Sequence, residues 1–115
     1  MERVAVTYFD GKIFKHFGKC KFFKIYDIDN NRITNTNIIP SNGVSHCELV
    51  KYIVAQKVST IICGNMGYPM QVKFNELNIK IIGGVEGDPD NAILQYINGT
   101  LVGKEEFGSD CKCEH

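Results

Sequence analysis

Residues 60–69 read Thr-Ile-Ile-Cys-Gly-Asn-Met-Gly-Tyr-Pro, and this stretch decides the class of fold. It begins with a short apolar run, which is typical of a strand buried in a parallel sheet. The glycines at 64 and 67 indicate a loop, and Pro69 suits the first turn of a helix. A strand, a loop and a helix in this order predict a βα unit.

The residues on either side extend this unit in both directions. The capping box Ser45-x-x-Glu48 predicts a preceding helix from His46 to about Lys57. Residues 79–82 form the next strand, and residues 88–99 form a third helix that an aspartate caps and a glycine ends. The second half is therefore a pair of βα units, which should have parallel strands and right-handed crossovers.

The first half has a different pattern. Residues 4–8, 22–28 and 32–39 are expected strands, separated by turn residues, and they predict an antiparallel meander. The sum is an α/β fold with a mixed sheet and helices packed over it. Ligands on such sheets bind beyond the carboxyl ends of the parallel strands, where the loops after Tyr8, Cys63 and Ile82 are expected to meet.

Composition narrows the class of protein. A chain of 115 residues predicts one domain, which we place at residues 1–102, followed by a flexible, cysteine-rich tail at 103–115. Lys plus Arg and Asp plus Glu both number 13, so the net charge is zero and nucleic-acid binding is disfavoured. The start lacks a signal-peptide pattern and no apolar run has membrane-spanning length, so we expect a cytoplasmic protein that does not contact a membrane.

Soft metal ligands are frequent in this chain. It has 3 His and 5 Cys, and imidazole and thiolate together suit zinc, copper or iron–sulfur species. His16 and Cys20 lie four residues apart in an expected loop. His16 could instead bond the backbone, and Cys20 could equally be a small buried residue at the start of a strand.

His46 and Cys47 occupy the first two positions of an expected helix. The partial positive charge of a helix N-terminus lowers the pKa of a thiol and disfavours imidazolium, and both effects favour metal binding. Neighbouring helical residues point in different directions, so we expect one ligand and one bystander. A solvent-facing helix start without a role is the competing interpretation.

Three further features are better explained by structural roles than by ligand binding. Cys63 ends a buried strand and is expected in the core. Met66 either contacts a bound ligand or, as we favour, fills a gap beneath Gly67. The glycines at 83, 84 and 87 do not form a phosphate loop, because no Lys-Ser/Thr follows and acidic residues occupy the next helix start.

The tail Cys111-Lys112-Cys113-Glu114-His115 alternates possible ligands. Alternate residues of an extended segment point the same way, so Cys111, Cys113 and His115 could face one zinc or copper ion that still needs a fourth ligand. A Cys-x-Cys redox pair and an end without a role are the alternatives.

The ordered set of loop residues resembles a known family. The matching residues are Val4-Ala5-Val6 before Asp10-Gly11, His16-Phe17-Gly18, Phe23-x-Ile25-Tyr26-Asp27, Gly64-Asn65-Met66-Gly67, the loop from Gly83 to Asp88, and Gly99-Thr100-Leu101. Together they resemble the dinitrogenase iron–molybdenum cofactor biosynthesis family over residues 3–102. This group includes nitrogenase accessory proteins of the NifX and NafY type and the C-terminal domain of NifB.

The resemblance implies a ribonuclease-H-like, three-layer α/β/α fold whose mixed, five-stranded sheet has one antiparallel strand. It also implies a non-catalytic protein that binds or carries an iron–sulfur or iron–molybdenum-type cluster or its precursor, with a delivery or acceptor protein as partner. The expected contacts are His16, Gly18, Cys20, His46, Cys47, Gly64 and Met66, with direct metal ligands among His16, Cys20, Cys47, Cys111, Cys113 and His115. The alternatives are a metal-free interaction module, a zinc- or copper-binding or thiol-redox protein that acts through the tail and, with less support, a metal-dependent nuclease, for which clustered carboxylates are lacking.

Overall fold

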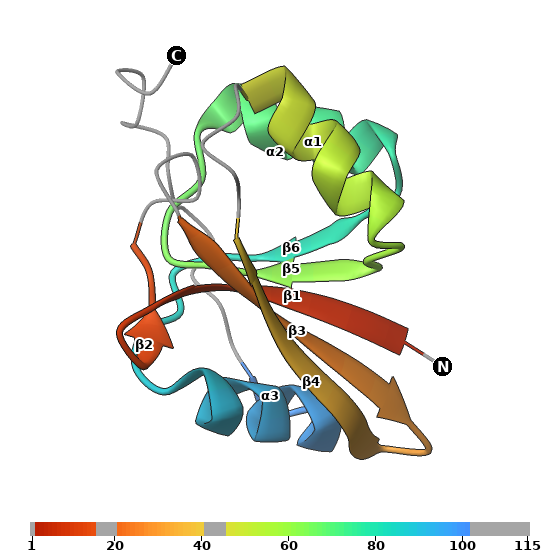
Figure 1. Ribbon diagram of the computed structural model, residues 1–115, viewed down its shortest axis with the longest axis vertical. Coiled ribbons are helices and arrows are strands. Elements are labelled where there is room, and N and C mark those ends of the chain that lie inside the picture. Colours follow the sequence, from red (N-terminus) through yellow and green to blue (C-terminus); the bar gives the residue numbers. More distant parts are fainter. Residues whose placement is uncertain (1, 16–20, 41–45, 102–115) are drawn as a thin grey trace.

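The computed structural model describes residues 2–15, 21–40 and 46–101, with the backbone alone over 46–49. The helices and strands follow one another in the order that the sequence predicts, apart from one added strand (Figure 1). The elements are β1 (Glu2–Phe9), β2 (Lys12–Ile13), β3 (Phe22–Asp29), β4 (Arg32–Pro40), α1 (His46–Ala55), β5 (Thr60–Ile62), α2 (Tyr68–Glu76), β6 (Lys80–Ile82) and α3 (Pro89–Asn98).

The sheet joins the two halves of the chain through its first strand. The strand order is β4-β3-β1-β5-β6. β1 pairs antiparallel with β3, and β3 pairs antiparallel with β4, so the predicted meander is confirmed. β1 also pairs parallel with β5, which pairs parallel with β6, as expected for the βα units. The central strand is therefore the most N-terminal one.

The predicted number of five strands is wrong for this sheet, which has six. The additional strand, β2, has two residues and pairs antiparallel with β1. Asp10 and Gly11 turn the chain back with φ angles of 51° and 80°. Two residues are too few to show a strand periodicity, which explains why the sequence did not indicate β2.

Helices cover both faces of the sheet (Figure 1). Side chains of β1 point alternately to the two faces, so this strand contributes to both cores. Ala5 packs on the side of α1 and α2, whereas Val4 and Val6 pack on the side of α3. Side chains of successive strand residues point to opposite faces, so a strand buried on both sides must be apolar throughout. The two clusters share no residue, and the sheet separates them.

The helix ends follow local chemistry. Asp88 caps α3 by accepting a hydrogen bond from the Asp90 amide, and Gly99 ends it at a φ of 75°, both as predicted. α1 is shorter than expected because it ends at Ala55, and Lys57 has a φ of 60°, which a continuing helix does not allow. Among the described residues, no helix has the length and apolar character needed to cross a membrane.

Candidate functional site at the carboxyl edge

The carboxyl ends of β1, β5 and β6 lie at one edge of the sheet, toward the left in Figure 1. β4 runs in the same direction as β1, because both are antiparallel to β3. The connections that leave these four strands therefore all begin at the same edge. The sequence predicted three of these connections as neighbours.

Backbone hydrogen bonds join the three predicted loops to one another. The Ile13 amide donates to the Gly87 carbonyl at 2.8 Å, and the Gly84 amide donates to the Gly64 carbonyl at 2.6 Å. The Asn65 amide donates to the Lys15 carbonyl at 2.5 Å, which closes the triangle. The expected meeting of these loops is confirmed, and it needs no side-chain contact.

Gly64 has a specific steric role in this arrangement. A Cβ atom added at Gly64 would lie 2.8 Å from the Lys15 carbonyl oxygen and 2.9 Å from the Lys15 Cα. Real side chains do not approach the backbone this closely, so only glycine fits here. The segment that ends at Lys15 is thereby held against the loop after β5.

Most of the predicted ligand residues lie outside the part of the chain that the structure describes. His16, Gly18 and Cys20 lie in 16–20, outside the described residues, and so do Cys111, Cys113 and His115 of the tail. Both flanks of 16–20 are described: Lys15 is bonded at the edge, and Phe22 begins β3 beside Tyr8. The backbone of His46 and Cys47 forms the first two positions of α1, as predicted, and their side chains are outside the description.

Two residues of the loop after β5 belong to the core. Cys63 is fully buried, and Met66 is 1% exposed in the cluster beneath α1 and α2. The core position predicted for Cys63 is confirmed. The burial of Met66 favours its packing role over contact with a cargo. Gln71 holds the loop from the other side, because its side-chain amide donates to the Met66 carbonyl at 2.8 Å.

The N-termini of α2 and α3 differ in charge. α2 begins after Gly67 with no side-chain cap and no acidic residue in its first turn. α3 begins with Asp88 and Asp90, which supports the rejection of a phosphate loop there. The uncapped start of α2, next to Gly64, retains the partial positive charge that favours an anion.

Asp90 also anchors α3 to the sheet. Its carboxylate accepts hydrogen bonds from the Lys24 ammonium at 2.8 Å and from the Tyr26 hydroxyl at 2.5 Å. These two donors hold the pKa of Asp90 below its usual value. Burial, and then the hydrogen bond to Asp90, raise the pKa of Tyr26, so this phenol stays protonated at neutral pH.

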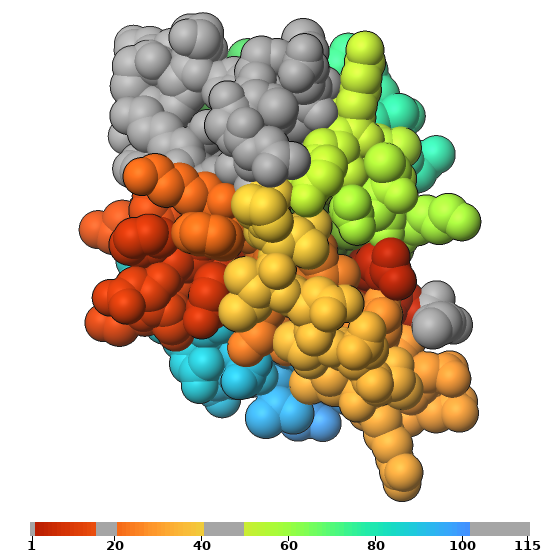
Figure 2. Space-filling view, in the orientation of Figure 1, coloured from red at the N-terminus to blue at the C-terminus, as the bar shows by residue number. Residues whose placement is uncertain are grey.

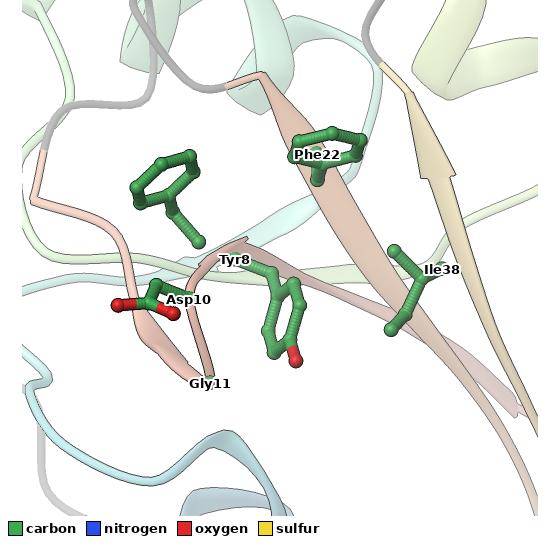
Figure 3. A pocket seen from close by; sticks show the side chains of 6 residues that line it. Tyr8, Asp10, Gly11, Phe22 and Ile38 are labelled. Atoms are coloured by element: carbon green, nitrogen blue, oxygen red, sulfur yellow. The ribbon is translucent and has the colours of Figure 1, made fainter.

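A hollow that the sequence did not indicate lies beside the edge on the α3 side of the sheet. It has a volume of about 670 Å³. Figure 3 shows Tyr8 between the Asp10–Gly11 turn and Ile38, with the Phe22 ring nearby. Phe9 completes the lining. Strand pairing brings Tyr8 beside Phe22, and no sequence pattern reveals such a cross-strand neighbour.

The opposite edge of the sheet is closed by side chains. Arg3 Nε lies 2.6 Å from Asp27 Oδ1, and Arg3 Nη1 donates to the Gln56 carbonyl at 2.8 Å. The hydrogen bond from Arg3 holds the pKa of Asp27 below its usual value. The Glu2 carboxylate accepts from the hydroxyls of Tyr96 and Thr60. These bonds connect β1, β3, β5 and α3.

The described residues contain no group of three or more His, Cys, Asp or Glu side chains placed to hold a metal ion. At the described part of the carboxyl edge, the sulfur-containing side chains of Cys63 and Met66 are buried in the core. The other predicted soft ligands lie in 16–20, at the first residues of α1 and in the tail, and their side chains are outside the description.

Comparison with known proteins finds one matching family and relatives over most of the chain. A family model described as dinitrogenase iron–molybdenum cofactor matches residues 2–99. An uncharacterised protein of Methanocaldococcus jannaschii, MJ0327, is 32% identical over 99 residues, which cover 86% of this chain and 90% of the relative.

Solved structures agree. The crystal structure of PH0822 superposes with a TM-score of 0.82 at 26% identity, covering 96% of this chain and 97% of that one. The crystal structure of the M. jannaschii protein, provisionally described as a dinitrogenase, superposes with a TM-score of 0.76 at 31% identity and covers 90% and 95%. Two solved relatives thus share the arrangement over nearly their whole length.

Proposed function

Because this chain belongs to the dinitrogenase iron–molybdenum cofactor family, we propose that it binds and carries an iron–sulfur or iron–molybdenum-type cluster or its precursor. The family is one of cofactor handling, and it is not known for catalysis. The protein would act as a non-catalytic carrier. Its partners would be the cluster itself and a protein that delivers or accepts it.

The observation that carries this proposal is the fixed position of Lys15. Its carbonyl is bonded to the Asn65 amide, and Gly64 leaves no space between the two segments. His16 is the next residue in the sequence, and Lys15, to which it is attached, lies at the point where three loops meet. A ligand that starts from a rigid base loses less conformational entropy when it binds a metal.

Electrostatics supports an anionic cargo at the same place. Iron–sulfur clusters held by thiolates carry negative charge, and the uncapped N-terminus of α2 next to Gly64 favours negative charge. We propose His16, Cys20 and Cys47 as metal ligands. Gly18, Gly64 and the start of α1 at His46 would provide close backbone contact.

The remaining residues have secondary parts in the proposal. Met66 would support the loop from within the core rather than touch the cargo. Cys111, Cys113 and His115 would form an accessory capture site. We also propose that the layered arrangement, with helices on both faces and β3 antiparallel in the main strand path, is ribonuclease-H-like. A cytoplasmic location is part of the same proposal.

Anaerobic reconstitution with ferrous iron and sulfide tests the carrier function. The full-length protein, His16→Ala, a truncation after Gly108 and Cys63→Ala would be compared by iron content and visible absorption. Cys63→Ala is the matched thiol control, because Cys63 is buried in the core. We expect bound iron that is lost in His16→Ala and retained in the truncation and in Cys63→Ala.

Other results would contradict parts of the proposal. Iron lost only on truncation would place the site in the tail and favour a tail-based metal or redox protein. Full-length protein that binds no iron and shows no cluster absorption would overturn the iron–sulfur carrier and leave a metal-free interaction module as the better account.

A further inference from the structure

The hollow at the end of β1 combines aromatic rings with one carboxylate. Of its six lining residues, three are aromatic, one is aliphatic and one is glycine, and Asp10 carries the charge. Phe9, Phe22 and Ile38 expose 46%, 37% and 50% of their surface. Contiguous exposed apolar surface of this kind marks interaction sites.

The charge of the lining argues against a cluster in this hollow. An anionic cluster would meet the Asp10 carboxylate and the negative faces of aromatic rings. Both features instead attract a cation, since a cation over a ring face and an ion pair with a carboxylate are each favourable. The hollow therefore has a chemistry opposite to that of the edge around Gly64.

The protein already holds one cation against the same aromatic surface. The Lys24 ammonium lies 5.6 Å from the centroid of the Tyr8 ring and 5.4 Å from that of Tyr26. The Lys24 ammonium forms its ion pair with Asp90, at 2.8 Å, and not with Asp10. The Tyr8 ring is thus suited to a cation, and within the described part of the chain Asp10 forms no ion pair, so its carboxylate could bind a second one.

We propose that this hollow is a recognition site for an arginine side chain of a partner protein. Arginine fits better than lysine, because a planar guanidinium can stack on a ring and bond both oxygens of a carboxylate. Arginine and aromatic side chains are also the residues that dominate binding at protein interfaces. The site stands apart from the cluster function and does not depend on it.

The test uses full-length, metal-free, reduced protein and N-acetyl-L-arginine methylamide as the probe. Binding would be followed by chemical-shift changes of the Tyr8, Asp10 and Phe22 amides. N-acetyl-L-norleucine methylamide, which has an apolar side chain and no charge, is the matched neutral probe. We expect saturable shifts with a Kd on the order of 10 mM for arginine, and binding of norleucine about fivefold weaker.

Variants locate the interaction. Asp10→Asn should weaken arginine binding about three- to fivefold, and asparagine tolerates the φ of 51° at this position. Phe9→Leu should weaken it about two- to fivefold, because the ring is lost and apolar surface is kept. Asp29→Asn makes the same charge change at the other end of β3 and should leave binding unchanged.

Three outcomes would overturn the proposal. Equal binding of norleucine would mean that the hollow takes apolar groups without regard to charge. Absence of saturable shifts at Tyr8 and Phe22 up to about 100 mM probe would mean that no such site exists. An equal effect of Asp29→Asn and Asp10→Asn would mean that net charge, not the hollow, governs binding.

Discussion

The two ends of the same strands are closed in different ways. At the amino end of β1, charged and hydroxyl side chains bond one another across three strands and a helix, and they belong to Glu2, Arg3, Asp27, Thr60 and Tyr96. At the carboxyl end, the described contacts between loops are backbone hydrogen bonds, and Gly64 allows two segments to touch. Thr7 and Gln71 are exceptions, because the Thr7 hydroxyl donates to the Phe14 carbonyl at 2.9 Å and the Gln71 side-chain amide donates to the Met66 carbonyl at 2.8 Å.

If the carboxyl edge is the binding site that we propose, this difference separates the residues that stabilise the sheet from those that bind the cargo. The side chains that close the amino end already bond one another. Backbone closure at the carboxyl end joins the described parts of the loops without requiring hydrogen bonds between their side chains. The two ends should therefore respond differently to substitution, and three variants test this expectation.

Gly64→Ala should have the largest effect. The new methyl group would meet the Lys15 carbonyl at 2.8 Å, and backbone cannot move aside as a flexible side chain can. We expect a loss of about 1–3 kcal/mol in the free energy of unfolding, measured in urea, together with loss of iron binding.

Gly99→Ala is the control for Gly64→Ala. Gly99 has a φ of 75° with open space around its Cα, so alanine is strained there without touching the edge. It should cost about 1 kcal/mol and retain iron binding. Retained iron binding in Gly64→Ala would contradict the role of the Lys15 contact.

Arg3→Met should destabilise the protein by about 1–2 kcal/mol and leave iron binding unchanged, because it removes charged hydrogen bonds only at the amino end. The buried Asp27 carboxylate would lose its ion pair. Urea unfolding with an iron-binding assay on the same samples measures both. Loss of iron binding without loss of stability would contradict the assignment of Arg3 to stability and of the carboxyl end to binding.

The loss of stability caused by Arg3→Met should depend on pH. Arg3 holds the pKa of Asp27 below its usual value, so this pair stabilises the fold above the unfolded pKa of about 3.9. The stabilisation is lost as the pH falls through the lower, folded pKa. The difference between wild type and Arg3→Met should therefore be constant near neutrality and narrow below about pH 4. A difference that grows in acid would contradict the assigned pair.

Thr7→Val should have the smallest effect, about 0.5–1 kcal/mol, because it removes one neutral hydrogen bond and keeps the buried shape. Hydrogen exchange at individual amides gives the more informative result for Thr7→Val. Faster hydrogen exchange at the Ile13 and Asn65 amides, with unchanged exchange in β3, would show that Thr7 holds the segment before His16 in place. Uniform acceleration throughout the sheet would mean that Thr7 contributes only to global stability.

Much of the fold could be predicted because the decisive signals are local. The apolar run before Cys63, the aspartate at 88 and the glycine at 99 each act within a few residues, and the structure agrees with all three. The meeting of the loops was predictable from a rule about strand direction. β2 was not, because two residues carry no periodicity.

The site was less accessible to sequence reasoning. The contact of Lys15 with Gly64 joins residues 49 positions apart, and its signal in the sequence is only a glycine in a loop. The hollow requires the register that places Tyr8 beside Phe22 and Lys24 beside Ile38. Register depends on turn geometry and packing, which no single residue encodes.

The surface of β4 is also a product of topology. Figure 2 shows this strand on the viewed face of the molecule, between α1 and α3. Residues 32–38 are exposed, although the strand contains isoleucines at 33 and 38. Among the described residues, β4 pairs with β3 alone, at the end of the strand order, and these isoleucines, which look like core in the sequence, face solvent.

The central position of the first strand has a consequence for how the chain folds during synthesis. One flank of β1 can pair as soon as β3 has left the ribosome, and the hairpin of β3 and β4 adds to it at once. The other flank waits for β5, since Val4 pairs with Thr60. A nascent chain that ends before Thr60 carries an apolar strand with one open edge, which favours recruitment of chaperones and slows the last folding step.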